Sequence, residues 1–331
     1  MDLTVRPYAD GNDLPLIADL IRAAPPLSRH GVDFPWRLSS PTLQAPEDVR
    51  LYATTDGALV GFAAWQSFWA VLDFYVRPGP YRQEVEVALF EWVPGRFRAL
   101  DAERGQPLPY WTEAREDDSE RLALIERHGY VLDDDYTYVM MSRPLDELLP
   151  RPAPPDGVVI RSLAGVRDVP AYVALHRRAF ASTSMTTEWR ARTLSMPQYR
   201  PELDLVAVAP DERLVGFCVG WGAPEGDAVQ IEPLGVDPEL QGQGLGGALM
   251  LELFRRCQAL GVDHVLVETE SSRWPARRAY EAVGFRPIYQ TLRKGQWFSA
   301  SQGEQHGGSV DASTAQGVRP PEGIRSDAAD Q

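Results

Sequence analysis

The sequence predicts an α+β protein made of two related domains. Three observations support this prediction. The chain has 331 residues, which is more than a typical single domain contains. Its second half alternates strand-like and helix-like hydrophobic patterns, and its first half repeats the same order of elements. In each half, antiparallel strands followed by one β-α-β unit predict a mixed, mostly antiparallel sheet flanked by helices.

Two stretches of unusual composition mark the boundaries of the domains. Five prolines lie between Pro144 and Pro155, and proline disrupts both helices and central strands. From about Ser299 onward the chain has too few large apolar residues to offset the entropy that ordering would cost. We therefore predict a first domain over 1–145, a linker over 146–156, a second domain over 157–297 and a disordered tail over 298–331.

The hydrophobic pattern of the second domain predicts its elements in order. The predicted strands cover 157–163, 203–209, 213–221, 228–236, 262–268 and 285–293. The predicted helices cover 169–180, a segment near 188–194, a long stretch from a glycine-rich loop to about 260, and 275–284. In the long helix, Leu245, Leu249 and Leu253 lie on one apolar stripe, and Gly261 ends it.

Composition disfavours several functional classes. A net charge of −14 argues against a nucleic-acid partner, whose backbone would be repelled. No apolar run reaches the roughly 18 residues of a membrane span, and the first residues lack the pattern of a signal peptide. We therefore expect a cytoplasmic protein that does not bind membranes. Cys218 and Cys257 cannot build a disulfide framework, and the five histidines lack metal-ligand spacing, so no metal is expected.

The strongest functional signal is the glycine-rich stretch VDPELQGQGLGGALMLELF, residues 236–254. A Walker loop is excluded because no Gly-Lys-Ser/Thr follows. Gly242, Gly244 and Gly247 fit the G-x-G-x-x-G fingerprint of a dinucleotide-binding oxidoreductase, with Glu268 about 20 residues later. This alternative is weaker because five residues separate the first of these glycines from its strand. A loop whose backbone amides hold a pyrophosphate at a helix N-terminus fits better.

Two motifs resemble signatures of the GNAT superfamily of acyl-CoA-dependent N-acyltransferases. The first is Gln241-Gly242-Gln243-Gly244-Leu245-Gly246, preceded by Val236-Asp237-Pro238. The second is the segment ARRAYEAVGF, residues 276–285. The resemblance covers roughly 157–294 and implies two tandem GNAT-like domains. It implies transfer of an acetyl group from acetyl-CoA, as co-substrate, to an amine of a small molecule or peptide. A non-catalytic CoA-sensing protein with the same cradle is the alternative.

The resemblance also implies roles for individual residues. Pro233 offers no N–H, so its strand should part from the next one, and GNAT proteins insert the pantetheine arm of CoA into that gap. The implied cofactor-binding residues are Leu234, Gly235, Val236, Gln241, Gly242, Gln243, Gly244, Leu245, Gly246 and Gly247.

Tyr280 is the implied general acid and Glu232 the implied base. The alternatives are a tyrosine that only packs on the sheet and a glutamate that is solvated or anchors a substrate ammonium. Glu268 and Glu270 are weaker candidates for binding a cationic substrate. Arg273 stands where many GNAT proteins carry asparagine, so that contact to the cofactor is in doubt, although an arginine could reach a CoA phosphate.

The first domain aligns on the second without gaps around this loop. When Val76 is set on Val236, the glycine positions 242, 244, 246 and 247 become Arg82, Glu84, Glu86 and Val87. Two carboxylates and several Cβ atoms then occupy the phosphate cradle. Tyr280 becomes Ile125 when the two later helices are aligned. We therefore predict that residues 1–145 form a degenerate copy without catalytic function.

Overall fold

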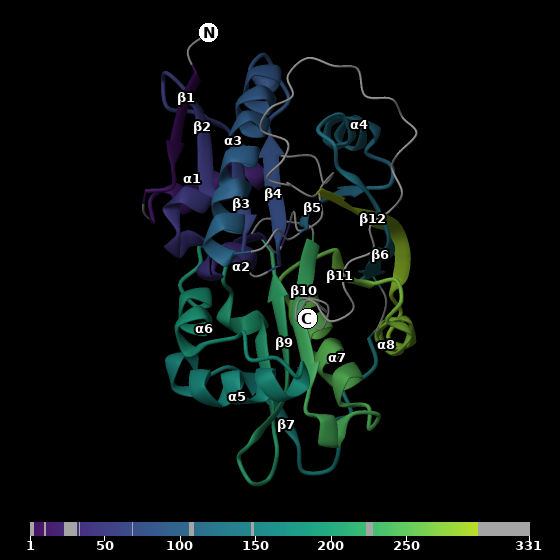
Figure 1. The fold of residues 1–331 in the computed structure, drawn as a ribbon. Coiled ribbons are helices and arrows are strands. Elements are labelled where there is room, and N and C mark those ends of the chain that lie inside the picture. Colours follow the sequence, from purple (N-terminus) through teal and green to yellow (C-terminus); the bar gives the residue numbers. More distant parts are fainter. Residues whose placement is uncertain are drawn as a thin grey trace.

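The structure is a computed structural model that describes residues 3–9, 11–22, 32, 34–67, 69–105, 109–146, 149–222 and 228–296. The fold class is α+β, as predicted: a single sheet of 12 strands is flanked by helices (Figure 1). The predicted tail over 298–331 lies outside the described residues.

The two halves contain the same elements in the same order. The first half has β1 (Leu3–Pro7), α1 (Asp13–Arg22), α2 (Phe34–Leu38), β2 (Val49–Thr54), β3 (Leu59–Gln66), β4 (Val71–Val76), α3 (Arg82–Arg104), β5 (Tyr110–Arg115), α4 (Ser119–Arg127) and β6 (Val131–Pro144). The second half has β7 (Val159–Ser162), α5 (Val169–Ala179), α6 (Thr187–Thr193), β8 (Asp204–Val208), β9 (Leu214–Trp221), β10 (Ala228–Val236), α7 (Leu245–Ala259), β11 (His264–Glu270), α8 (Trp274–Ala282) and β12 (Arg286–Gln296). All predicted elements of the second half are present, with small shifts at their ends.

An ion pair within each half also repeats. Arg6 binds Asp13 seven residues later in the first half, and Arg161 binds Asp168 in the same way in the second. Each aspartate also accepts a backbone N–H from the residue four positions before it. This shared local motif supports the view that the chain is a tandem repeat.

The last strand of each half lies within the other half. The strand order is β1-β2-β3-β4-β5-β12-β6-β11-β10-β9-β8-β7. β6 pairs antiparallel with β11, with Tyr138 opposite Glu270, and β12 pairs antiparallel with β5, with Leu292 opposite Ala114. β12 and β6 also pair with each other. Figure 1 shows β12 running beside β5 of the first half. The centre of the sheet is therefore built from strands that the two halves exchange.

Helices cover both faces of the sheet. On one face, α3 packs with strands of the first half and α7 with strands of the second, forming two separate apolar clusters. On the other face, a single apolar cluster runs through both halves. Within this cluster, a tryptophan of the second half contacts two tryptophans of the first half. The centre of the Trp189 ring lies 6.0 Å from that of Trp36 and 5.9 Å from that of Trp69. The Trp189 indole N–H also donates to Ser39 Oγ at 3.1 Å. The halves thus share a buried interface as well as a sheet.

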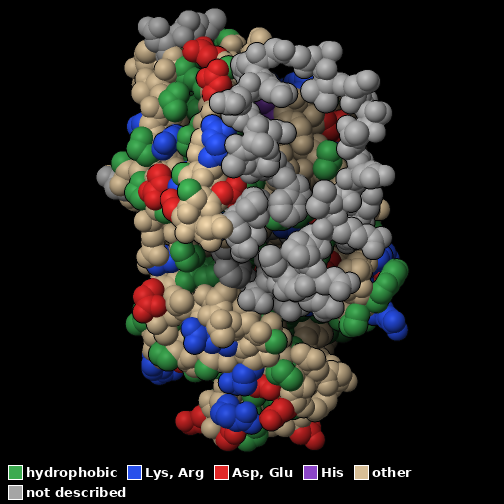
Figure 2. All heavy atoms as spheres, in the orientation of Figure 1, with side chains coloured by type: hydrophobic (Ala, Val, Ile, Leu, Met, Phe, Trp, Pro, Cys, Tyr) green, Lys and Arg blue, Asp and Glu red, His purple; other side chains and the backbone are tan. Residues whose placement is uncertain are grey.

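Figure 2 shows positive, negative and hydrophobic side chains interspersed over the coloured part of this face. Within the described ranges, no helix combines the length and apolar character that crossing a membrane requires.

His176 on α5 is buried in the shared apolar cluster. Its ring stacks on Phe217 of β9 with the ring centres 5.7 Å apart and an interplanar angle of 8°. Neither ring nitrogen has a hydrogen-bond partner among the described residues. Burial is the main cause that lowers the pKa of His176 to about 3, and nearby Arg190 adds to the effect. The ring is therefore neutral in the folded protein.

His176 should make the protein less stable in acid. Below about pH 6.5 the unfolded chain binds a proton at this histidine that the folded protein does not, so stability falls as pH falls toward 3. We expect the free energy of unfolding of wild type to drop by about 2 kcal/mol more than that of His176→Phe between pH 6.5 and pH 5. Denaturant titrations at both pH values measure this difference. Phe180→Leu, a packing change nearby, should keep the wild-type dependence, and equal dependence in wild type and His176→Phe would contradict the assignment.

Candidate active site

A cavity of about 520 Å³ opens between β10 and β11 and extends to the N-terminal ends of α7 and α8. All of the predicted site residues except Gln243 line it. The side-chain amide of Gln243 instead donates to the Glu239 carbonyl at 3.0 Å, outside the cavity. Glu268 lines the cavity, whereas Glu270 does not. Phe180, at the end of α5, contributes to the wall and was not predicted from the sequence.

The cavity exists because β10 parts from β11 halfway along its length. The parallel ladder between the two strands ends at Ile231 opposite Val267. The next residues are Glu232 and Pro233, and proline cannot donate a ladder hydrogen bond. β10 then pairs again with β9 from Leu234 opposite Cys218 onward. The second half of β10 is thus held on one side only, and its other edge faces the cavity.

The glycine-rich loop forms one end of the cavity. Gly242 and Gly244 have φ angles of 75° and 83°, a left-handed conformation that favours glycine. Gly246 has room for a side chain, because an added Cβ would come no closer than 3.7 Å to Val236. Packing therefore does not require glycine at 246. α7 begins at Leu245, and no side chain caps its first turn. Its free amides and dipole favour an anion at this point.

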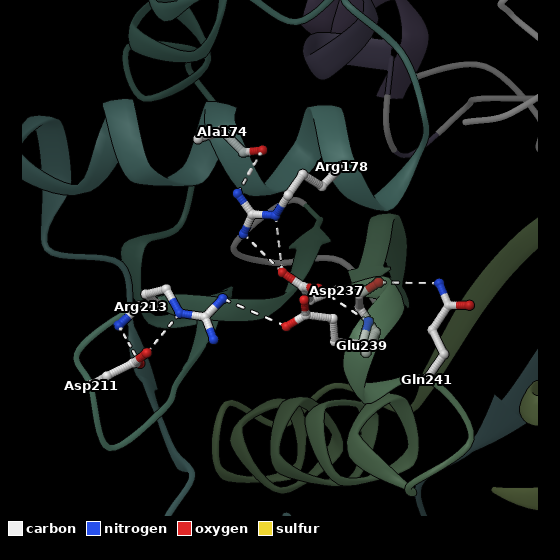
Figure 3. A network of polar contacts seen from close by, with 8 residues as sticks. Ala174, Arg178, Asp211, Arg213, Asp237, Glu239 and Gln241 are labelled. Carbon is white, nitrogen blue, oxygen red and sulfur yellow. Dashed lines mark hydrogen bonds and ion pairs between the residues drawn. The ribbon is translucent and has the colours of Figure 1, made fainter.

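Ion pairs brace the segment that leads into this loop (Figure 3). Arg178, at the end of α5, donates two hydrogen bonds to Asp237 Oδ2, at 3.0 and 2.8 Å. Asp237 is almost fully buried and also accepts the N–H of Glu239. The Gln241 side-chain amide donates to the Val236 carbonyl at 3.2 Å. The loop is therefore fixed by contacts with its own backbone and with α5. Sequence reasoning missed Arg178 because 59 residues separate it from Asp237.

Tyr280 and Glu232 lie in the same cavity. Tyr280 reaches it from α8 and is buried. Burial raises the pKa of the Tyr280 phenol, Glu232 raises it further, and Arg273 lowers it. The phenol is therefore protonated at neutral pH and able to donate a proton. Trp221 Nε1 donates to the Glu232 carbonyl at 2.6 Å and so anchors the backbone where the strands part.

Glu268 supplies a second carboxylate near the end of β11. It is buried and accepts a hydrogen bond from Thr291 Oγ1 at 3.0 Å. Two carboxylates, one phenol and one guanidinium thus meet in a cavity whose far end suits an anion. This arrangement can bind a long anionic ligand and move protons at its other end.

The corresponding region of the first half is closed. α3 begins at Arg82, which aligns with Gly242, whereas α7 begins only at Leu245. The positions that form the glycine-rich loop in the second half therefore belong to the helix in the first half. β4 and β5 pair only at Val71 opposite Trp111. Arg121 fills the gap beyond this pair, donating to the carbonyls of Glu113 at 2.9 Å and Phe74 at 3.0 Å.

The guanidinium of Arg121 also stacks on the Phe74 ring, 3.9 Å from its centre. Alignment of the later helices places Ala276 at this position in the second half, where it lines the open cavity. The space left in the first half is about 90 Å³. A side chain thus occupies the gap that the second half keeps open.

The sheet topology also distinguishes a dinucleotide-binding fold from the other explanation of the glycine-rich loop, a pyrophosphate-binding loop at a helix N-terminus. A dinucleotide-binding fold needs several adjacent parallel strands. Among the described strands, only β4–β5 and β10–β11 pair in parallel. The dinucleotide-binding alternative is therefore excluded.

Comparisons with known proteins identify the relatives of this chain. Residues 170–285 match the Acetyltransferase (GNAT) family. The chain is 31% identical over 295 residues to a mycothiol acetyltransferase of Thermomonospora curvata, covering 86% of this chain and 95% of the relative. It is 30% identical over 251 residues to a mycothiol acetyltransferase of Actinosynnema mirum, covering 73% and 81%.

Two solved structures share the fold over nearly the whole chain. A GCN5-related N-acetyltransferase from Sphaerobacter thermophilus gives a TM-score of 0.60 at 24% identity, covering 89% of this chain and 96% of its own. A tandem GNAT protein from the clavulanic acid biosynthesis pathway gives a TM-score of 0.62 at 17% identity, covering 91% and 100%. The tandem architecture predicted from the sequence is therefore present in experimentally solved proteins.

The pair formed by Arg178 and Asp237 should stabilise the protein more than its exposed neighbour. Arg178→Ala leaves a buried carboxylate without its charged partner, and we expect the free energy of unfolding to fall by about 1–3 kcal/mol. Arg213→Ala removes a pair in which both side chains are more than half exposed and should change it by less than about 0.5 kcal/mol. Denaturant unfolding measures both. Equal effects would show that burial of Asp237 does not matter.

Proposed function

Since the chain belongs to the GNAT family of acetyltransferases, we propose that it acetylates an amine of a small molecule with Glu232 as base and Tyr280 as acid. The observation that carries this proposal is the single cavity that contains both side chains and the glycine-rich loop. The comparisons support the enzyme over a protein that only senses CoA, because relatives over most of the chain are acetyltransferases.

Acetyl-CoA fits the cavity with its pyrophosphate at the glycine-rich loop and its thioester near Tyr280. The uncapped amides of α7 suit the phosphates, and the absence of side chains at Gly242, Gly244 and Gly246 leaves their approach open. In a strand, successive backbone N–H groups point to opposite sides. Because β10 bonds to β9 along one edge only, the alternate backbone groups between Leu234 and Val236 point toward the cavity. Apart from the Val236 carbonyl, which accepts from Gln241, they can pair with the pantetheine arm or polarise the thioester carbonyl.

The reaction removes two protons from the acceptor ammonium and adds one to the sulfur. Glu232 takes a proton from the acceptor ammonium, so that the neutral nitrogen can attack the thioester carbonyl. As the carbon–sulfur bond breaks, Tyr280 gives its phenolic proton to the sulfur. Burial raises the pKa of the phenol, so the proton stays on Tyr280 at neutral pH until negative charge develops on the sulfur. The nitrogen loses its second proton to the Tyr280 phenolate, directly or through water, and Glu232 releases its proton to water, which restores the enzyme.

The acceptor proposed here is the amine that mycothiol acetyltransferases acetylate, because two relatives of that name match most of the chain. Two carboxylates in the cavity suit a cationic amine, and Glu268 is the candidate for holding it. Incubation of the purified protein with acetyl-CoA and a panel of small amines that includes this acceptor, followed by mass spectrometry, tests the choice. Preferred acetylation of a chemically different amine would overturn the assignment of the acceptor and leave the enzyme class intact.

Removal of either proton-transfer group should reduce turnover. We expect Tyr280→Phe and Glu232→Gln each to lower kcat by about 10²–10⁴-fold, with little change in the affinity for acetyl-CoA. Tyr81→Phe, the same chemical change in the first half, should leave kcat unchanged. Steady-state rates with a good acceptor measure the effect. Wild-type rates in both variants would disprove the assigned roles.

Each chain should bind a single acetyl-CoA, in its second half. Gly246→Glu copies Glu86 of the closed half and places a carboxylate where the phosphates are expected, so we expect at least a 100-fold loss of affinity. Gly246→Ala has room for its methyl group and should lose little affinity. Glu86→Gly should leave the stoichiometry at one, because Arg121 still fills the gap. Isothermal titration calorimetry measures all three, and two equivalents bound to wild type would refute the closed first half.

A further inference from the structure

Arg273 is the only cationic side chain among the described residues that line the cavity. It lies in the turn between β11 and α8 and is half-buried. Its guanidinium makes no hydrogen bond or ion pair with any carboxylate in the described part of the chain, although Glu232 and Glu268 line the same cavity. The chain contains 47 acidic and 33 basic residues, so carboxylates are not scarce. An arginine in a cavity that pairs with no carboxylate of the described residues is suited to a charge that arrives with the ligand.

Arg273 lies directly before α8, the helix that carries Tyr280, and both side chains line the same cavity. Side chains on a helix lean toward its N-terminus, so the Tyr280 ring leans toward the end of α8 at which Arg273 lies. The electrostatic influence of Arg273 on the Tyr280 phenol, which lowers its pKa, agrees with this proximity.

We propose that Arg273 is a further catalytic residue that stabilises the negative charge developing on the thiolate sulfur as the acetyl group leaves. The inference rests on the proposed function, in which Tyr280 donates the proton. When the carbon–sulfur bond breaks, its electron pair moves to the sulfur, and Tyr280 transfers a proton to that atom. Arg273 keeps its own proton throughout and acts through its charge, which is strongest in a site that excludes water.

A contact between Arg273 and a CoA phosphate is a second role that fits the same observations. The two roles differ in which part of the donor they need. A phosphate contact requires the nucleotide portion of CoA, whereas stabilisation of the sulfur requires only the thioester end. Donors that lack the nucleotide therefore distinguish them.

The kinetic test compares wild type with Arg273→Ala and Arg273→Lys on three acetyl donors. With acetyl-CoA, we expect Arg273→Ala to lower kcat by about 10–100-fold and Arg273→Lys to keep most activity. With S-acetylpantetheine, the loss should be the same. With an aryl thioester, whose thiolate is intrinsically more stable, the loss should shrink. A loss with acetyl-CoA that vanishes with S-acetylpantetheine would assign Arg273 to a phosphate, and no loss with either donor would also overturn the proposal.

A binding measurement gives a readout that does not depend on turnover. The thiol of bound CoA should have a lower pKa in the protein with Arg273 than in Arg273→Ala, because the cation favours the thiolate. Ultraviolet absorbance of the thiolate follows this titration, and both proteins should carry Tyr280→Phe to remove the phenol. Equal thiol pKa values would overturn the proposal. Unchanged turnover in Tyr280→Phe alone would instead contradict the proposed function, so the two failures are distinguishable.

Discussion

The proline at position 233 is the constraint on which the site depends. Because Pro233 offers no N–H, the ladder between β10 and β11 ends beside it, while β10 stays attached to β9. One edge of a strand in the interior of the sheet thereby becomes available to a ligand. The glycine-rich loop and α8 then close the ends of the opening. A missing donor in one strand thus leaves an open strand edge in the cavity, where a low local dielectric strengthens the electrostatic interactions of the charged groups.

The two halves show how one scaffold can keep or lose this opening. In both, the parallel pair of strands separates after a short ladder. In the second half Ala276 leaves the gap clear, and in the first half Arg121 bridges the two strands with hydrogen bonds of its own. The guanidinium donates to a carbonyl of each strand beyond the point where their own pairing ends. The separation of β4 from β5 is therefore closed by a side chain of the protein itself.

The sequence predicted the elements of the second half and most of the cavity, because both follow from local patterns. Short motifs in the sequence suffice to predict the positions of Gly242 and Gly244, of Pro233 and of Tyr280. The contacts that escaped prediction join residues far apart. Arg178 and Asp237 are one case, and the pairing of β6 with β11 is another, since periodicity identifies a strand and not its partner. Arg121 was missed because an arginine on a helix is usually solvated.

The exchange of β6 and β12 has a consequence for how the protein is made. The first half leaves the ribosome before β11 and β12 have been synthesised. Since these two strands are the neighbours of β6 in the folded sheet, β6 emerges without either of them. Its two edges stay unpaired until more than a hundred further residues have been added, and unpaired edges invite association with other chains. The central strands must therefore assemble after β12 has been synthesised. Such long-range closure makes folding slow, and nascent chains that stall between the halves are the species a cell would have to protect.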